Sequence, residues 1–200
     1  MKKHLFIHVG HYKTGTTALQ DFFVRNVTYL KIHGFEYPSV LLEYNKHSLL
    51  AFAMLREGGV EKLMHGYNNP VSSGEFWREL ADHVRGSAFP NTLVSTEELI
   101  RNGELDDASD RLSVVAGLLK EIDVKIIIYL RNPQSHLASW HNQLIKMGIP
   151  VSDIATAVCR GEIESIHTDF AKAVRPWVRC FGADNVILRD YDKARIGHTG

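Results

Sequence analysis

The chain has 200 residues, of which 44% are hydrophobic, and this is enough for one compact domain with a single core. Its 23 acidic and 23 basic residues cancel, so no overall field would draw the protein to nucleic acid or to an anionic membrane, and we expect neither partner. The two cysteines, Cys159 and Cys180, are too few for a disulfide framework, so we expect a reducing, cytoplasmic location.

Short apolar runs alternate with longer helical patterns, which favours an α/β domain with a mainly parallel sheet. The first run, within HLFIHVG, is too short for a signal peptide or a membrane span. The predicted strands are Leu5 to Val9, Thr92 to Ser95, Lys125 to Leu130 and Val186 to Leu188. The run KIIIYL is almost continuously apolar and β-branched, which predicts a strand in the middle of the sheet.

Helical periodicity predicts seven helices between these strands. They are Thr16 to Asn26, Lys46 to Arg56, Glu75 to Arg85, Ala108 to Glu121, Gln134 to Met147, Val151 to Cys159 and Thr168 to Phe181. The segment from Glu57 to Gly74 is rich in Gly, Asn, Ser and Pro, and it is either a plain connecting loop or a lid on the substrate side. We expect a single domain over residues 1–200.

Eleven histidines raise the question of a metal site. The pairs His8 with His11 and His136 with His141 have neither a recognised zinc spacing nor a clear third ligand. We therefore interpret them as surface or hydrogen-bonded histidines and expect no metal to be required.

The segment Gly10 to Thr17, GHYKTGTT, joins the first predicted strand to the first predicted helix. Such a turn gathers unpaired backbone N–H groups and the positive end of a helix dipole at one point, where an anion is stabilised. Gly10 and Gly15 have the spacing of a P-loop, but Thr16 stands at its lysine position and the lysine, Lys13, lies inside the loop. The pattern predicts a nucleotide phosphate site with a relocated cation.

A second motif, Arg131-Asn132-Pro133, follows KIIIYL, and Ser139 comes eight residues after the arginine. An arginine fork suits a phosphate, and Pro133 can begin a helix that carries Ser139 inward. Both motifs lie at carboxyl ends of predicted parallel strands, the edge where open α/β sheets bind ligands. They can therefore hold two phosphates of one ligand.

Together, Lys13-Thr14-Gly15-Thr16-Thr17 and the arginine–serine motif resemble those of sulfotransferases that use 3′-phosphoadenosine 5′-phosphosulfate (PAPS). The segments Ser95-Thr96-Glu97 and FGADNVILRDYD, from Phe181 to Asp192, extend the resemblance over residues 4–192. It implies a three-layer fold like that of P-loop NTPases, with helices flanking a central, mainly parallel sheet. PAPS is then the co-substrate, no metal is required, and a small molecule or carbohydrate supplies the hydroxyl or amine acceptor.

The resemblance also implies a role for each motif. The loop residues Lys13, Thr14, Gly15, Thr16 and Thr17 would bind the 5′-phosphosulfate end, with Lys13 offsetting charge on the departing phosphate. Arg131 and Ser139 would contact the 3′-phosphate. The candidates for the base that takes the acceptor proton are Glu97, then Glu98, then His11.

The sequence departs from the family pattern in two places. Ala18 stands where an aromatic residue often stacks on adenine, and Gly200 comes before the C-terminal segment that family members usually have. We therefore expect a short variant or a truncated domain.

Two other functions stay open. A nucleotide-dependent kinase would need Mg²⁺ and an aspartate after an apolar strand, but Arg131 and Arg189 stand directly after KIIIYL and VIL. The other alternative is a non-catalytic nucleotide-binding domain.

Overall fold

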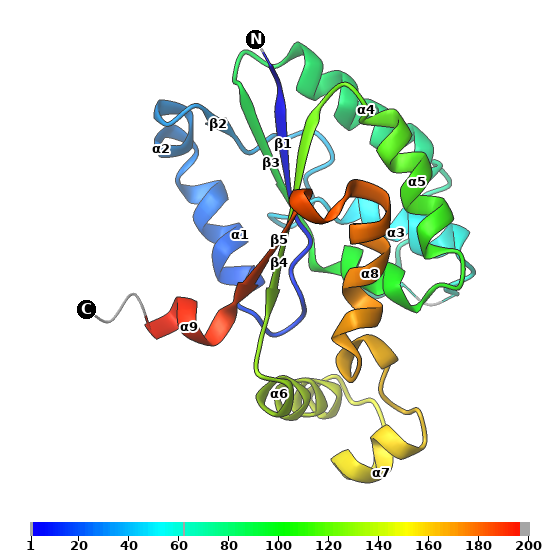
Figure 1. Ribbon diagram of the computed structural model, residues 1–200. Helices are drawn as coiled ribbons and strands as arrows, with labels where there is room; N and C mark the ends of the chain where they lie inside the picture. Colours follow the sequence, from blue (N-terminus) through cyan, green and yellow to red (C-terminus); the bar gives the residue numbers. More distant parts are fainter. Residues whose placement is uncertain (1, 62, 197–200) are drawn as a thin grey trace.

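A parallel sheet of five strands, in the order β2-β3-β1-β4-β5, forms the centre of the protein (Figure 1). The computed structural model describes residues 2–61 and 63–196. The strands are β1 His4–His8, β2 Phe35–Glu36, β3 Asn91–Ser95, β4 Asp123–Leu130 and β5 Val186–Asp190. All four pairings are parallel, so the carboxyl ends of the strands meet at one edge of the sheet.

The register of β1 with its neighbours determines which residues reach this edge. His8 at the end of β1 pairs with Ser95 at the end of β3 and with Ile127 of β4. Because β4 runs on to Leu130, Arg131 follows beyond the level at which β1 ends. The KIIIYL strand is an interior strand as predicted, although β1 and not β4 occupies the central position.

Helices cover both faces of the sheet. The α-helices are α1 Thr16–Arg25, α2 Val27–Ile32, α3 Ser48–Glu57, α4 Ser73–Gly86, α5 Ala108–Leu118, α6 Pro133–Lys146, α7 Ile154–Cys159, α8 Phe170–Phe181 and α9 Tyr191–Ile196. Short 3₁₀ helices are η1 Met64–Gly66, η2 Glu97–Glu104, η3 Ser165–His167 and η4 Ala183–Asn185. In Figure 1, α1 and α2 lie on one side of the sheet, α3, α4, α5 and α8 on the other, and α6 beyond the end of β4.

The strand period of two divides the core between these layers. Leu5 and Ile7 of β1 are fully buried in the larger core, with side chains of α3, α4, α5 and α8. Phe6, which lies between them in the sequence, packs against the smaller core around Phe23 of α1 and Leu30 of α2. The arrangement is the predicted three-layer α/β fold.

The structure corrects some predicted boundaries. The strand β2 and the helices α2 and α9 were not predicted, and the segment 57–74 contains η1. The third helix begins at Ser48 and not at Lys46, because the backbone of Lys46 pairs with that of Glu43 in an isolated antiparallel bridge. Lys46 therefore lies on a turn that leads into α3.

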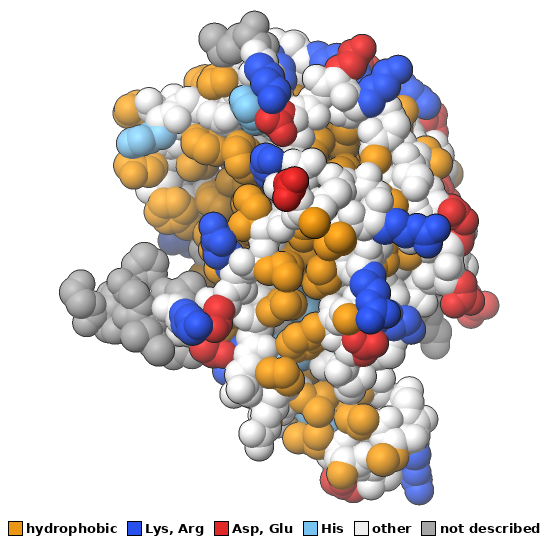
Figure 2. All heavy atoms as spheres, in the orientation of Figure 1, with side chains coloured by type: hydrophobic (Ala, Val, Ile, Leu, Met, Phe, Trp, Pro, Cys, Tyr) orange, Lys and Arg blue, Asp and Glu red, His pale blue; other side chains and the backbone are white. Residues whose placement is uncertain are grey.

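The surface mixes charges of both signs. In Figure 2, Lys and Arg side chains lie near Asp and Glu side chains along the top and right of this face, while apolar side chains gather at its upper left and continue down through its middle. Among the residues that the structure describes, no helix is long and apolar enough to cross a membrane.

Candidate functional site

The turn after β1 has an unusual backbone. Gly10, Lys13 and Gly15 have φ angles of 70°, 64° and 74°, in the left-handed region that favours glycine. A Cβ on Gly10 would lie 2.9 Å from Thr16 Cγ2, and one on Gly15 would lie 3.3 Å from Tyr191 Cε2. Lys13 adopts the same conformation with a side chain, and such local strain is typical of functional sites.

Gly15 is also the N-cap of α1, and it makes no side-chain cap hydrogen bond. A helix leaves its first N–H groups without partners inside the helix, and the dipole makes this end positive. The loop and the ten-residue helix α1 thus form a cradle for an anion at the carboxyl end of β1.

A cavity of about 430 Å³ opens beside this cradle. Six of the predicted binding residues line it, together with one of the predicted bases: Lys13, Gly15, Thr16, Thr17, Arg131, Ser139 and Glu97. The rest of the lining comes from Tyr12, Met64, Trp140, Gln143, Met147 and Tyr191. The two motifs, distant in the sequence, therefore meet at one cavity.

The two cationic side chains are held by neighbouring polar groups. Lys13 Nζ donates to Gln143 Oε1 of α6 at 3.1 Å. Arg131 Nη1 lies 3.5 Å from the carbonyl oxygen of Lys13, and its Nε lies 3.9 Å from Asp192 Oδ1. The guanidinium carbon is 5.6 Å from the ring centroid of Tyr191, within cation–π range.

Two predicted site residues of the phosphate loop, Thr14 and His11, do not line the cavity. Thr14 is buried, and its hydroxyl donates to the carbonyl oxygen of His11 at 2.5 Å. This hydrogen bond stabilises the turn and does not point into the cavity. His11 is fully buried, and its Nε2 donates to the carbonyl oxygen of Ile166 at 3.0 Å. Burial lowers the pKa of His11 to about 4, which keeps the ring neutral.

The two glutamates after β3 have different surroundings. Glu97 faces the cavity; its Oε2 accepts from Gln20 Nε2 at 2.8 Å and its Oε1 from Lys46 Nζ at 3.1 Å. Glu98 is fully buried and accepts from Lys46, from the Thr96 hydroxyl and from Ser48 Oγ. Glu97 is thus the predicted base that reaches the cavity.

Lys46 was not predicted as a site residue. Burial lowers its pKa, but the carboxylates of Glu98 and Glu97 outweigh burial, so the pKa is raised and the side chain stays charged. No sequence signal marks this role, since Lys46 lies about 50 residues before the glutamates and the three meet only in the folded chain.

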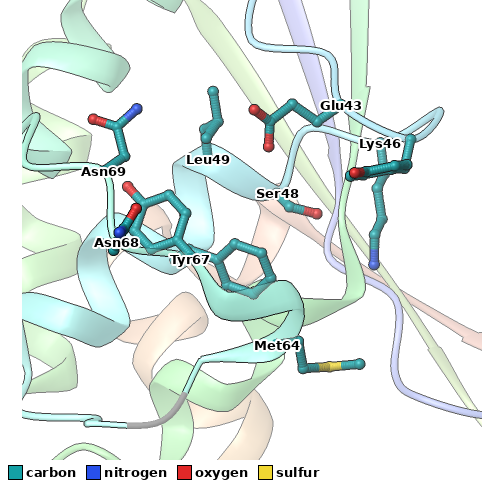
Figure 3. A pocket seen from close by; sticks show the side chains of 10 residues that line it. Glu43, Lys46, Ser48, Leu49, Met64, Tyr67, Asn68 and Asn69 are labelled. Atoms are coloured by element: carbon teal, nitrogen blue, oxygen red, sulfur yellow. The ribbon is translucent and has the colours of Figure 1, made fainter.

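A second cavity, of about 330 Å³, lies next to the first, and Met64 lines both. In Figure 3, Asn68 and Asn69 stand on one side of it and Glu43 and Lys46 on the other. Its remaining lining is Tyr44, Ser48, Leu49, Phe52 and Tyr67. The segment 57–74 therefore contributes Met64, Tyr67 and both asparagines to the site region.

The histidines are hydrogen-bonded, as interpreted from the sequence, but they group differently from the two pairs considered there. His8 Nδ1 lies 2.8 Å from Ser95 Oγ, and His141 Nε2 donates to the Ser152 carbonyl, as hydrogen-bonded histidines do. His11 and His136, however, meet a third histidine, His167, and one ring nitrogen from each lies within 4.8 Å of the others. Neither pair considered in the sequence forms this group: it takes one histidine from each pair, and His167 comes from a distant element, η3.

Comparison with known proteins identifies the family. The sequence matches the family described as "Sulfotransferase domain" over residues 2–195. A search of curated proteins finds no significant match. Solved structures of similar fold include a sulfotransferase from Alicyclobacillus acidocaldarius, with 16% sequence identity and a TM-score of 0.57, and the match covers 100% of this chain and 77% of that one. The structural likeness supports the fold, and the sequence match over almost the whole length shows that this chain belongs to the sulfotransferase domain family.

Proposed function

We propose that the protein transfers a sulfuryl group from PAPS to a hydroxyl or amine of a small-molecule or carbohydrate acceptor. The observation that carries this proposal is the shared cavity, in which Lys13 of the phosphate loop lies with Arg131 and Ser139 of the second motif. A donor with phosphates at its 5′ and 3′ ends matches two separate cationic points better than a donor with one phosphate chain does.

The residues present fit such a donor. The cradle at the N-terminus of α1 and the ammonium of Lys13 would hold the 5′ end, because backbone N–H groups and a cation both favour phosphate. Arg131 and Ser139 would hold the 3′-phosphate. Tyr191, whose ring lies beside Arg131, offers an aromatic face to the adenosine, a role that Ala18 cannot fill.

When bound, PAPS supplies a sulfuryl group joined to the 5′-phosphate through a bridging oxygen. As that S–O bond breaks, Lys13 would offset the negative charge that develops on the leaving phosphate. The protein contributes mainly position and charge in such transfers, as it does in phosphoryl transfer. A lysine on a strained loop suits this task, since its position is held before the donor binds.

Glu97 is our candidate for the base. Its carboxylate faces the cavity, and hydrogen bonds from Gln20 and Lys46 fix its orientation. It would take the acceptor proton as the new S–O or S–N bond forms. The second cavity, across Met64, would receive the rest of the acceptor, and the amides of Asn68 and Asn69 suit a hydroxylated molecule.

The position of Arg131 bears on the kinase alternative. A kinase places an acidic ligand for Mg²⁺ after an apolar strand, whereas here an arginine follows β4. Asp192, after β5, lies against that arginine, with 3.9 Å between Oδ1 and Nε. A cation supplied by the protein at this point favours a donor that is used without metal.

Calorimetry with adenosine 3′,5′-bisphosphate, the product of the transfer, tests the proposal. We expect tight binding that Mg²⁺ does not change, and release of the bisphosphate from PAPS when a suitable acceptor from a panel of sugars, phenols and alcohols is present. Preference for ATP with Mg²⁺ would indicate the kinase. Binding of neither nucleotide would indicate a non-catalytic domain.

A further inference from the structure

A buried cluster of three histidines lies behind the wall of the donor cavity. His11 comes from the phosphate loop, His136 from the first turns of α6 and His167 from η3. Their side chains are almost completely inaccessible, with exposed fractions of 0%, 0% and 1%. The ring centroids of His11 and His136 are 4.2 Å apart, and Trp140, which lines the cavity, stacks on His167 at 4.1 Å.

The hydrogen bonds of the cluster leave one nitrogen of each ring without a partner. These atoms are Nδ1 of His11, Nδ1 of His136 and Nε2 of His167, and all three are buried. Buried polar atoms in folded proteins are almost always hydrogen-bonded, so these unpartnered ring nitrogens require an explanation. Those of His136 and His167 lie on the sides of the rings that face away from the hydrogen bond between the two residues.

The tautomers can be assigned from the partners that are present. A carbonyl oxygen only accepts, so His11 Nε2 carries the hydrogen that Ile166 receives, and His11 Nδ1 is a bare lone pair. His136 Nε2 and His167 Nδ1 share one hydrogen bond of 2.9 Å, so whichever ring donates has a second bare lone pair at its other nitrogen. At least two buried lone pairs therefore have no donor.

We propose that His11, His136 and His167 bind one divalent transition-metal ion, with Zn²⁺ as the best fit. Neutral imidazoles are the ligands that Zn²⁺ takes most readily besides thiolates, and three of them form a common zinc site. An ion between the rings would take the place of the proton that His136 Nε2 and His167 Nδ1 share, with the bare Nδ1 of His11 as the third ligand. Zinc–nitrogen bonds of about 2.0–2.1 Å place tetrahedral ligands about 3.4 Å apart. The facing pair, now 2.9 Å apart, would separate by about 0.5 Å, and nitrogens as far as 4.8 Å apart would approach by about 1.4 Å at most.

A carboxylate stands beside the cluster. Glu164 Oε2 lies 3.7 Å from His167 Nε2, and its Oε1 accepts from Arg101 at 2.7 Å. Because Nε2 lies on the opposite side of the ring from Nδ1, which faces His136, this carboxylate is placed to orient the histidine, as outer carboxylates do at histidine metal sites.

The ion would have a structural task. His11 belongs to the loop that carries Lys13, and His136 lies on the helix that carries Ser139. One ion bound to both would fix the two halves of the phosphate cavity relative to each other, from the side away from the ligand.

Metal titration of the full chain tests the proposal without any donor or acceptor. After treatment with a chelator and desalting, we expect Co²⁺ to give the intense visible bands of a four-coordinate site, and Zn²⁺ to remain at one ion per chain after gel filtration. Zn²⁺ is also expected to raise the melting temperature. A wild-type protein that retains no ion and gives only the weak spectrum of hydrated Co²⁺ would overturn the proposal.

Two variants identify the ligands. His167→Ala is expected to lose the Co²⁺ bands and the zinc-dependent rise in melting temperature, whereas His33→Ala, a change at an exposed histidine of α2's C-terminal end, keeps both. Circular dichroism shows whether His167→Ala is folded; if it is not, the wild-type titration alone decides. A folded His167→Ala that binds one ion as tightly as the wild type would refute the assignment.

Discussion

Lys13 is a charged residue in a backbone conformation that side chains rarely adopt, with φ of 64°. Its position is held by Gln143, which accepts from Nζ, and by Arg131, which approaches its carbonyl oxygen. A glycine would adopt this backbone conformation more easily, but it would bring no positive charge to the cavity. The strain and the charge together single it out among the site residues.

We expect Lys13→Ala to reduce the rate of transfer from PAPS by at least about 100-fold, the usual cost of losing one group that stabilises developing charge. The fold should persist, because the ammonium lies at the cavity and not in the core. Turnover by Lys13→Ala and by the exposed control Lys120→Ala measures this. A Lys13 variant with wild-type turnover would remove the residue from the mechanism.

Arg131→Ala should act mainly on donor affinity. A charge-assisted contact to the 3′-phosphate would be lost, which costs about 1.5–3 kcal/mol, or about 10- to 150-fold in Kd. Calorimetry with adenosine 3′,5′-bisphosphate compares this variant with Arg160→Ala, at an exposed arginine after α7. Equal affinity of the two variants for the bisphosphate would show that Arg131 contacts the phosphate loop but does not bind the 3′-phosphate.

The variant Glu97→Gln tests whether Glu97 acts as the base in the reaction or contributes to binding of the donor. The amide keeps the size of the carboxylate but cannot take a proton, so we expect kcat to fall by about 10²- to 10⁴-fold. Affinity for the bisphosphate should change little, because Glu97 is assigned to the acceptor side. Glu121→Gln, at an exposed residue, is the control, and a kcat of Glu97→Gln that matches it would direct attention to another base.

At the scale of elements, η2 is the segment that places Glu97, and it packs closely on α8. A Cβ on Gly103 of η2 would lie 2.8 Å from the carbonyl oxygen of Lys172 and 3.0 Å from Ala173 Cα. Neither atom is the end of a flexible side chain, so the two elements could accept a methyl group only by moving apart.

We therefore expect Gly103→Ala to lower the free energy of unfolding by about 1–3 kcal/mol, the usual cost of overpacking. Gly117→Ala in α5 is the matched control: nothing lies within 4 Å of its added Cβ, and alanine in a helix is favoured by about 0.5–1 kcal/mol. Urea unfolding of both variants measures the difference. A Gly103→Ala protein as stable as Gly117→Ala would mean that η2 and α8 are not held at this distance.

Long elements with a clear period could be predicted from the sequence, whereas elements set by distant contacts could not. The strand β4 and the helix α6 are marked by a run of branched apolar residues and by Asn132-Pro133, where the asparagine caps Ser135 N. The strand β2 has two residues, too few for any period to show, and it exists because β3 is there to pair with it.

The residues of the candidate site likewise divide into those with a local sequence signal and those whose role depends on distant contacts. Gly10, Gly15 and Arg131 have local signals, since tight turns and strand ends restrict which residues fit. Lys46 and His167 have none, because the groups that give them a role come from other parts of the chain. Burial also could not be read locally: Glu97 and Glu98 are neighbours in sequence, yet only Glu97 reaches the cavity.

At the scale of the whole molecule, buried neutral histidines make stability depend on pH. Burial lowers the pKa of His8 and of His47 from 6.5 to about 4. His47 Nε2 donates to the Pro38 carbonyl, and its Nδ1 accepts from Ser95 N–H at 3.3 Å, so a second ring proton has no acceptor. The neutral ring is thus part of the folded structure.

Between pH 6.5 and 4 the unfolded chain binds protons at these histidines and the folded chain does not, so stability is full above pH 6.5 and falls as the pH drops toward 4. From pH 7.5 to 5 each histidine should cost about 2 kcal/mol. Urea unfolding in the presence of a chelator, so that no bound ion contributes, measures this loss. His47→Gln cannot take the proton. Over that pH range we expect its free energy of unfolding to fall by about 2 kcal/mol less than that of the wild type, which is the contribution of one histidine. If both proteins lose the same amount, His47 is protonated in the folded state, and the hydrogen bond from Ser95 N–H that joins α3 to the end of β3 does not form in solution.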